Sequence, residues 1–424
     1  MWPLPARSLR DVADDQAAPT AADQAIGARV RRVRSRRGLS LEQAAGLAGI
    51  GKSYLSKLET GQRRFIRRGL IEDLAQALSC SVADLTGQPY LAVDRQSVAA
   101  AAVIPAVSAA LHDVTLDDVP DVAARPVDQL ARAAGEALAY ADDVRFDLAA
   151  SGLDALVTEL HVQAVAGGED DRRTALAALV QATIVVRALA GTLGYAELAV
   201  TATRRGYDAA RRLERPDLVG LMAMGRAMTL GRLGARRRAE AIAETVLDEL
   251  ATEPGPSSED TTVAQARGML HLSAALVSAR DGRDDDAADH LTEAQSLADH
   301  TGEQNHLRYH FGPANVAAWD LTIGVESGTG PEAAERFTAA PIDLSVFGSR
   351  DRESNVWFDL ARAWAQAEGS RDGEVIRSLD TADRLAPMRV RNDPIARDLV
   401  ADLHRRTRHR TWELESLRNR LGVA

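Results

Sequence analysis

Apolar residues in the segment 25–88 fall into short groups with helical spacing, and glycines separate several of the groups. Spacing of three and four residues puts side chains on one face of a helix, so each group predicts one short helix. A tight turn containing Gly49 and Gly51 joins the second helix to the third. The five expected helices contain Ile26–Val33, Leu41–Ala48, Lys52–Thr60, Ile71–Leu78 and Val82–Leu85.

From about residue 126 onward, longer apolar patterns come in pairs that meet at glycines. The clearest pairs meet at Gly194, Gly234, Gly282 and Gly369, which are 40, 48 and 87 residues apart. Such near-repeats are typical of stacked helical hairpins, in which each hairpin buries its apolar face against its neighbours. No strand-like alternation persists in this part of the sequence. The pattern predicts an all-α fold in which a five-helix unit precedes an α-solenoid at residues 126–424.

The remaining segments are expected to be less regular. Residues 1–24 are predicted to be a flexible tail, and residues 89–125 a linker that is helical in part. The linker contains Pro89, Pro105 and Pro120, and its Ala-rich stretch from Val98 to Leu111 predicts a connecting helix or helix pair. The linker suits either a spacer between two copies of the N-terminal unit or a passive tether.

Charge is distributed unevenly along the chain. The net charge of −10 would argue against nucleic-acid binding if it were taken alone. The segment 25–88, however, has twelve basic and five acidic side chains, which leaves a net charge of −17 for the rest of the chain. The two lysines of the sequence, Lys52 and Lys57, lie in the third predicted helix. A basic unit beside an acidic remainder favours contact of that unit with nucleic acid.

The run GLSLEQAAGLAGIGKSYLSKLETGQRR supports this interpretation. Its Ala-Gly-Ile…Tyr-Leu-Ser-x-Leu-Glu-x-Gly spacing resembles the Cro/CI-type (xenobiotic-response-element, XRE) helix-turn-helix family. The resemblance implies that residues 52–60 form the recognition helix, with lysine and serine side chains at base edges and the following arginines on phosphates. The predicted DNA-binding residues are Lys52, Ser53, Tyr54, Ser56, Lys57, Arg63, Arg64 and Arg67.

Three positions depart from the pattern of that family. Gly51 stands where the recognition helix usually has a Ser or Thr N-cap, and Leu41 stands where a Gln often contacts phosphate. Phe65 replaces the usual proline after the arginine-rich loop. These departures affect individual contacts and leave the predicted fold unchanged.

Residues 46–53, GLAGIGKS, also satisfy the P-loop pattern G-x-x-x-x-G-K-[ST]. A P-loop follows directly after a buried strand, whereas residues 40–48 have helical spacing and no β-branched run. The sequence therefore favours a helix-turn-helix over a nucleotide-binding loop at this segment.

The C-terminal part carries a second resemblance. The unit from Val356 to Pro387 is similar to a tetratricopeptide (TPR) repeat, and it ends in Ala-Pro as that motif usually does. A helix-turn-helix followed by TPR-like repeats resembles multi-domain regulators of actinomycetes, often of secondary metabolism. In architecture it also resembles Gram-positive peptide-sensing regulators, whose TPR solenoids bind a short peptide.

The resemblance to peptide-sensing regulators implies a ligand site on the concave face of the solenoid. A bound peptide needs partners for its backbone, and an Asn amide both donates and accepts. Asn315 is the candidate for that role, Arg308 for a carboxylate, and the aromatic residues for an apolar wall. Alternatively, the aromatic residues belong to the core and Asn315 caps a helix. The candidate ligand residues are Arg308, His310, Phe311, Asn315 and Trp319.

Sequence patterns of catalysis and metal binding are absent. The nine histidines form no H-E-x-x-H or other metal-ligand spacing, and neither a G-x-S-x-G elbow nor a Rossmann fingerprint occurs. We expect no enzyme activity, no cofactor and no metal, and a buried structural thiol at Cys80. The N-terminus lacks the apolar region of a secretion signal, and the run 97–111 is too short to span a bilayer. A cytoplasmic, nucleoid-associated location without membrane contact is therefore expected.

Two functions are consistent with these patterns. The first is a sequence-specific transcriptional regulator, a homodimer that reads two half-sites of double-stranded DNA and whose TPR-like domain senses a signalling peptide, small molecule or protein. The second is a DNA-localised TPR scaffold without ligand sensing. The two differ in whether a ligand stabilises residues 126–424 and shifts DNA affinity.

Overall fold

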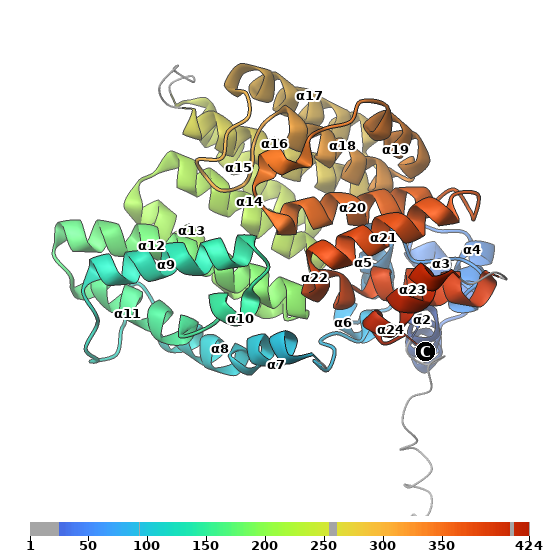
Figure 1. Ribbon diagram of the computed structural model, residues 1–424, viewed down its shortest axis with the longest axis horizontal. Helices are drawn as coiled ribbons and strands as arrows, with labels where there is room; N and C mark the ends of the chain where they lie inside the picture. The colour runs from blue at the N-terminus through green and yellow to red at the C-terminus, as the bar shows by residue number, and fades with distance from the viewer. Residues whose placement is uncertain (1–24, 93, 254–260, 408–410, 424) are drawn as a thin grey trace, which may run out of the picture.

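The computed structural model describes residues 25–92, 94–253, 261–407 and 411–423, and every regular element in these ranges is a helix (Figure 1). The expected all-α fold is confirmed. The tail predicted for residues 1–24 lies outside the described residues. The first helices form what we call the N-terminal unit: α2 (Ile26–Arg36), α3 (Leu41–Leu47), α4 (Lys52–Glu59), α5 (Arg68–Ala77) and α6 (Val82–Thr86).

Local sequence explains how the N-terminal unit begins and ends its helices. The Ser40 hydroxyl accepts from the Gln43 amide at 3.2 Å while the Gln43 side chain accepts from the Ser40 amide at 2.9 Å, a complete capping box for α3. Gly49 turns the chain with a φ of +67° between α3 and α4. A Cβ atom at Gly27 would lie 2.1 Å from the Leu58 carbonyl oxygen, so the absence of a side chain lets α2 cross α4 closely.

The remaining helices form what we call the helical array. Its first half consists of α7 (Arg95–Ala102), α8 (Ile104–Asp113), α9 (Val127–Asp142), α10 (Phe146–Ala149), α11 (Leu153–Ala166), α12 (Glu169–Leu193), α13 (Ala196–Leu213), α14 (Pro216–Arg232) and α15 (Arg236–Ala251). Its second half consists of α16 (Thr262–Arg280), α17 (Asp284–Thr301), α18 (Pro313–Ser327), α19 (Gly330–Ala339), the 3-10 turn η2 (Leu344–Phe347), α20 (Arg350–Ala365), α21 (Asp372–Leu385), α22 (Pro387–Arg391), α23 (Pro394–Arg406) and α24 (Trp412–Leu421).

Helices that follow one another in the array pack as hairpins, as the glycine-centred pattern predicts. The pairs α12–α13, α14–α15, α16–α17 and α20–α21 meet at the predicted turn glycines. Gly194, for example, ends α12 with a φ of +88°. The pair α18–α19 lies in a stretch where the apolar periodicity was too irregular to predict a hairpin. The array is therefore the solenoid expected from the sequence.

The segment 89–125 contributes to the core of the array. It contains α7 and α8, which pack against α10 and α11 respectively. Ala100, Ile104, Val107 and Leu111 are buried in the same hydrophobic cluster as residues of α9 to α14. These two helices consequently form the first layer of the array.

The array curves so that its last helices return to the N-terminal unit (Figure 1). A second hydrophobic cluster contains buried residues of α2 to α6 together with buried residues of α18 to α24. Leu55 and Leu74 from the N-terminal unit and Leu399 and Leu417 from the array are all fully buried in it. The two ends of the chain thus share one core.

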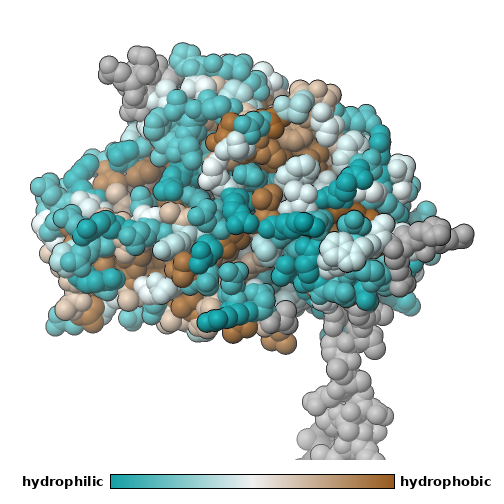
Figure 2. Space-filling view, viewed as in Figure 1, coloured by the Kyte–Doolittle hydropathy of each residue, from teal (hydrophilic) through white to brown (hydrophobic). Residues whose placement is uncertain are grey.

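Apolar side chains on the face drawn in Figure 2 and on the long helix α12 show where the protein buries its apolar surface. The face in Figure 2 is mostly hydrophilic, and its apolar side chains occur in separate patches. Among the described helices, α12 is long and apolar enough to cross a membrane by length and composition, but 72% of its apolar window is buried inside the protein. Its apolar residues are therefore used in packing the array.

Candidate nucleic-acid interface

Helix α4 presents one polar face to solvent and one apolar face to the core. Lys52, Ser53 and Lys57 are exposed, and Tyr54 and Ser56 are half-buried. The Lys52 ammonium lies 3.5 Å from a Glu42 carboxylate oxygen, but both side chains are more than 60% exposed, so this pair holds Lys52 only weakly. The five predicted residues of α4 thus lie on or beside one solvent-exposed surface, which a DNA molecule could reach.

A buried ion pair fixes the inner side of α4. The Arg34 guanidinium donates to both carboxylate oxygens of Glu59, at 2.6 and 2.8 Å, and also to the Leu39 carbonyl at 2.8 Å. These bonds raise the pKa of Arg34, since they stabilise its charged form. The bidentate pair ties α4 to α2, so the exposed lysines project from a rigid element.

The N-terminus of α4 is capped by Gly51, which supplies no side-chain hydrogen bond. Gly51, Lys52 and Ser53 are all exposed, so the first amide groups of the helix are accessible. Amides at a helix N-terminus bind anions, and a DNA phosphate is one such anion. The departure from the usual Ser or Thr cap therefore leaves this end open to a phosphate.

The arginines after α4 lie in a different environment from the lysines. Arg63 pairs with Glu368, and both side chains are more than 40% exposed. Arg64 donates to an Asp402 oxygen at 2.8 Å, and each of these two side chains is only 10% exposed. Burial lowers the pKa of Arg64 in spite of Asp402. The Nε atom of Arg67 is buried and has no hydrogen-bond partner among the described residues.

The segment after α4 is docked on the array through its backbone as well. Arg405 donates to the Gly61 carbonyl at 2.8 Å, and Arg362 donates to the Ile66 carbonyl at 2.8 and 3.0 Å. The Phe65 amide donates to Asp398 at 3.3 Å, while Phe65 itself is buried. The phenylalanine that replaces the family's proline therefore provides both an amide donor and an apolar anchor to the array.

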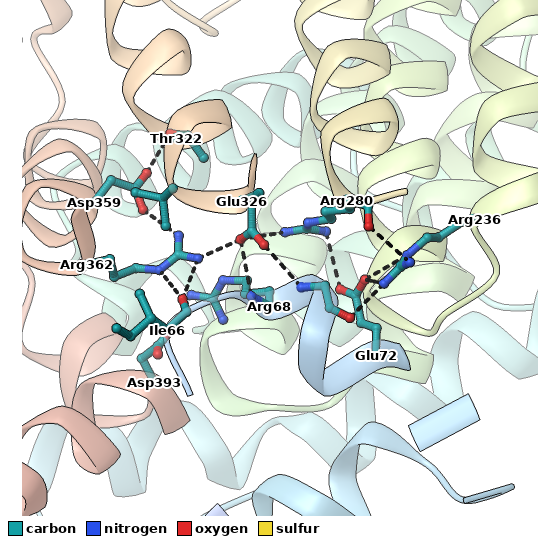
Figure 3. Close-up of polar contacts among 12 residues, drawn as sticks. Ile66, Arg68, Glu72, Arg236, Arg280, Thr322, Glu326, Asp359, Arg362 and Asp393 are labelled. Carbon is teal, nitrogen blue, oxygen red and sulfur yellow. Dashed lines mark hydrogen bonds and ion pairs between the residues drawn. The ribbon is translucent and has the colours of Figure 1, made fainter. Parts of the chain in front are cut away.

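Glu326, on α18, lies at the centre of this docked face (Figure 3). Its fully buried carboxylate accepts from the Gly69 amide at 3.1 Å, at the start of α5, and from Arg362 at 2.6 Å. Arg280 lies 3.7 Å away on the other side. Burial alone would raise the pKa of Glu326, but the two arginines and these hydrogen bonds lower it to about 2. The carboxylate is consequently charged at neutral pH.

Two further clusters extend the contact along α5. Glu72 lies between Arg236, at 3.1 Å, and Arg280, at 3.3 Å (Figure 3). Arg68 pairs with Asp393 at 2.5 Å. We call the residues Arg64, Arg68, Glu72, Glu326 and Arg362, together with their ion-pair partners, the docking network. Its charges alternate, so each buried ion has an opposite neighbour, as a low-dielectric interface requires.

The predicted ligand residues are not brought together at one surface. Trp319 lines a cavity between the N-terminal unit and the array. Phe311 is buried against Gly268, and Arg308 lies 3.2 Å from Asp142. His310 is buried beside the Phe347 ring, and burial lowers its pKa to about 4.

Asn315 is also buried, and its amide donates to the Tyr309 carbonyl and accepts from Arg352. It makes no cap for α18. Cys80 is half-buried, and burial raises the pKa of its thiol.

Comparisons with known proteins agree with the geometry of the N-terminal unit. A family model described as a helix-turn-helix domain matches residues 25–86. Residues 25–86 form a helix-turn-helix domain. Residues 40–47, which precede the P-loop-like lysine, are a capped helix within this domain and not the strand that a P-loop requires.

The search of curated proteins found no match. Among solved structures, the chain is similar to Bacillus thuringiensis PlcR in complex with the peptide PapR7 and DNA, with 12% identity and a TM-score of 0.28. The alignment covers 81% of this chain and 98% of that chain. A likeness at this TM-score carries no argument about function.

Proposed function

We propose that the protein is a sequence-specific transcriptional regulator whose helix-turn-helix domain reads double-stranded DNA with α4. One observation carries the proposal: Lys52, Ser53 and Lys57 are exposed on one helix whose opposite side is tied into the domain and whose neighbours are docked on the array. A helix presented in this way fits the major groove, where lysine donates to guanine. Tyr54 and Ser56 flank these contacts. A homodimer would place two copies of α4 on two half-sites.

In this proposal Arg63, Arg64 and Arg67 contact DNA phosphates. Arg63 and Arg64 can do so only after they leave an ion pair with the array. They form ion pairs with Glu368 and Asp402, so a phosphate must replace a carboxylate of the array. DNA binding and docking then compete for the same guanidinium groups. This competition is the physical basis on which the TPR-like array would control DNA affinity.

In this scheme residues 25–88 read DNA, residues 89–125 join the domain to the array, and residues 126–424 sense a ligand or a partner. The regulator would act in the cytoplasm and catalyse no reaction. Support for a sensing role comes from the docking network. A ligand that moves α18 would alter a contact made directly to α5, and one that moves α20 would alter the contact to Ile66, just before α5.

The test uses the full chain and a randomised DNA library. Repeated selection is expected to enrich one motif, with two half-sites if the dimer forms. Lys57→Ala should reduce affinity for the enriched DNA about tenfold and leave affinity for random DNA almost unchanged, because a base contact specifies and a phosphate contact does not. Arg204→Ala, on an exposed face of α13, is the control for loss of one positive charge.

If selection enriches no motif, the proposal is contradicted. It is also contradicted if Lys57→Ala loses the same affinity for enriched DNA as for random DNA. Either result would favour a scaffold protein that contacts DNA only through its charge.

A further inference from the structure

A cavity of about 620 Å³ lies between the helix-turn-helix domain and the concave side of the array. Helices α5 and α6 close one side of it, and α12, α14, α16, α18 and α20 form the others. Its apolar lining includes Trp319 and Phe358. This volume lies within the range of small-molecule sites, roughly 300–1,000 Å³.

The charge of the lining is unbalanced. Seven arginines and four carboxylates line the cavity. Arg68, Arg280, Arg362 and Arg389 are paired with carboxylates of Asp393, Glu72, Glu326 and Asp351, respectively. Arg187, Arg232 and Arg352 form no ion pair among the residues that the structure describes.

Arg232, at the end of α14, is the clearest of these three. Its side chain is exposed, and it lines the cavity. Within the described ranges it makes no hydrogen bond and no ion pair. Burial, together with the positive charges of Arg68 and Arg389, lowers the pKa of Arg232 to about 9. The cavity therefore holds a cation whose charge the surrounding protein does not neutralise.

Arg187 and Arg352 are oriented by neutral groups. Arg187 donates to the Tyr309 hydroxyl at 2.7 Å, and Arg352 donates to the Asn315 side-chain oxygen at 2.8 Å. The Arg187 Nε atom and one terminal nitrogen of Arg352 are buried and lack hydrogen-bond partners among the described residues. Neutral partners fix a guanidinium without cancelling its charge, so both arginines keep their capacity to bind an anion.

We propose that this cavity binds a small organic anion that carries two or more phosphate or carboxylate groups. Arg187, Arg232 and Arg352 would hold the acidic groups, because a guanidinium matches both groups with a fork of donors. Trp319 and Phe358 would contact its apolar part. Asn315 and Tyr309 act as positioning residues, since they hold the two arginines from behind the cavity.

The location of the cavity supplies a route to DNA. Arg68, Glu72 and Arg280 line it and also belong to the docking network. An anion in the cavity would attract Arg68 and Arg280 away from Asp393 and Glu72 and so alter the contact between α5 and the array. This consequence rests on the proposed function, whereas the binding itself does not.

Calorimetric titration of the full chain tests the site in the absence of DNA. The probes are pyrophosphate and citrate, each compared with sodium chloride at equal ionic strength, which removes general salt effects. At least one probe should bind, and Arg232→Gln should weaken that binding roughly tenfold or more, since it removes charge-assisted hydrogen bonds. Arg204→Gln, the same change on an exposed face of the array, should leave affinity unaltered.

The relative affinities decide the chemistry: tighter binding of pyrophosphate indicates a phosphate ligand and tighter binding of citrate a carboxylate ligand. Binding of neither probe would overturn the proposal, as would equal binding by the wild type and Arg232→Gln.

Thermal unfolding without ligand checks the folding of the variant. Because Arg232 has no described partner and neighbouring cations repel it, Arg232→Gln should melt at the wild-type temperature or above. A lower melting temperature would show that Arg232 is a structural residue and would refute its role as a free cation. Arg187→Gln, which loses one bond to Tyr309, should also weaken probe binding and gives an independent test of the site.

DNA affinity is then measured with and without the probe that binds. A change in the wild type that is absent in Arg232→Gln supports coupling between cavity and DNA. If the probe binds without changing DNA affinity, the coupling is refuted and the anion-binding site in the cavity stands. A chain that binds no DNA would refute the proposed function, while the calorimetric result would stand.

Discussion

The helix-turn-helix domain has two basic faces, and the structure uses them differently. The outer face of α4 carries exposed lysines with weak or no ion pairs. The face that begins at Arg64 and continues along α5 is packed on the array through buried charges. The sequence does not distinguish the two faces, because both appear in it as arginine and lysine of one basic segment. The comparison shows that a basic composition locates a DNA-binding domain without saying which of its cations meet DNA.

Burial accounts for the difference in strength between the two faces. An exposed pair such as Lys52–Glu42 is solvated with or without its partner and contributes less than about 1 kcal/mol. A buried carboxylate such as Glu326 has exchanged water for arginine and amide donors, so its loss leaves Arg280 and Arg362 with one carboxylate fewer in a medium that solvates cations poorly. Substitutions on the two faces should therefore differ in the type of effect that they have as well as in the size of that effect.

The largest effect is expected from Glu326→Gln. It leaves Arg280 and Arg362 without their shared carboxylate, which should lower the free energy of unfolding by about 3–5 kcal/mol. Chemical denaturation of the full chain at pH 7 measures this change. Glu332→Gln, on an exposed part of α19, is the matched control and should change stability little.

The pH dependence gives a second check of the same variant. Because the folded-state pKa of Glu326 is about 2, below its ordinary value of 4.5, its stabilisation is complete above pH 4.5 and is lost as pH falls toward 2. The variant should lack this part of the acid dependence. A variant as stable as the wild type at pH 7 would show that the docking network does not hold the domain.

A smaller effect is expected from Asp402→Asn, which weakens the hold of the array on Arg64. If Arg64 exchanges between carboxylate and phosphate, the variant should bind DNA several-fold more tightly, and the salt dependence should steepen by up to one phosphate contact. Glu368→Gln, which releases the exposed Arg63, should have less effect. Unchanged DNA affinity in Asp402→Asn would mean that Arg64 serves docking alone.

An effect confined to a window of pH is expected from Asp398→Asn. Burial raises the pKa of Asp398 to about 6, while the Phe65 amide, Arg405 and Arg64 oppose the rise and Asp402 adds to it. A raised carboxyl pKa costs stability as pH increases from about 4 to 6, because the unfolded chain releases the proton first. The variant should lose this dependence, which for a shift from 3.8 to about 6 amounts to about 3 kcal/mol. Thermal melting across this pH range measures it, and an unchanged slope would exclude Asp398 as its source.

Sequence periodicity predicted the fold well because local rules decide most of it. The capping box at Ser40 and the turn at Gly194 are specified by neighbouring residues, and the turn occurs where the pattern predicts it. The assignment of α7 and α8 to a linker missed their burial, since an Ala-rich helix has the same pattern whether it packs against a distant helix or lies free.

The candidate sites could be predicted only in part. The exposure of Lys57 and Ser53 follows from helix position alone, and their contact with DNA stays a prediction. Arg64 was assigned to phosphate because nothing nearby in the sequence reveals Asp402. Glu326 and Arg280 were missed, although a charge near the end of a mostly apolar helix is a signal of a buried pair. Asn315 was singled out for contact with a ligand, and the structure places it behind Arg352 instead.

The core that the N-terminal unit shares with the last helices also affects the order in which contacts form during synthesis. Phe65 and its partner Asp398 are 333 residues apart. At a synthesis rate of roughly 5–20 residues per second, the helix-turn-helix domain leaves the ribosome about 20–70 s before α23 does. During that interval Arg64 and Phe65 lack their partners on α23, Asp402 and Asp398. Every newly made chain therefore passes through a period in which the array holds its DNA-binding domain by only part of the final contacts.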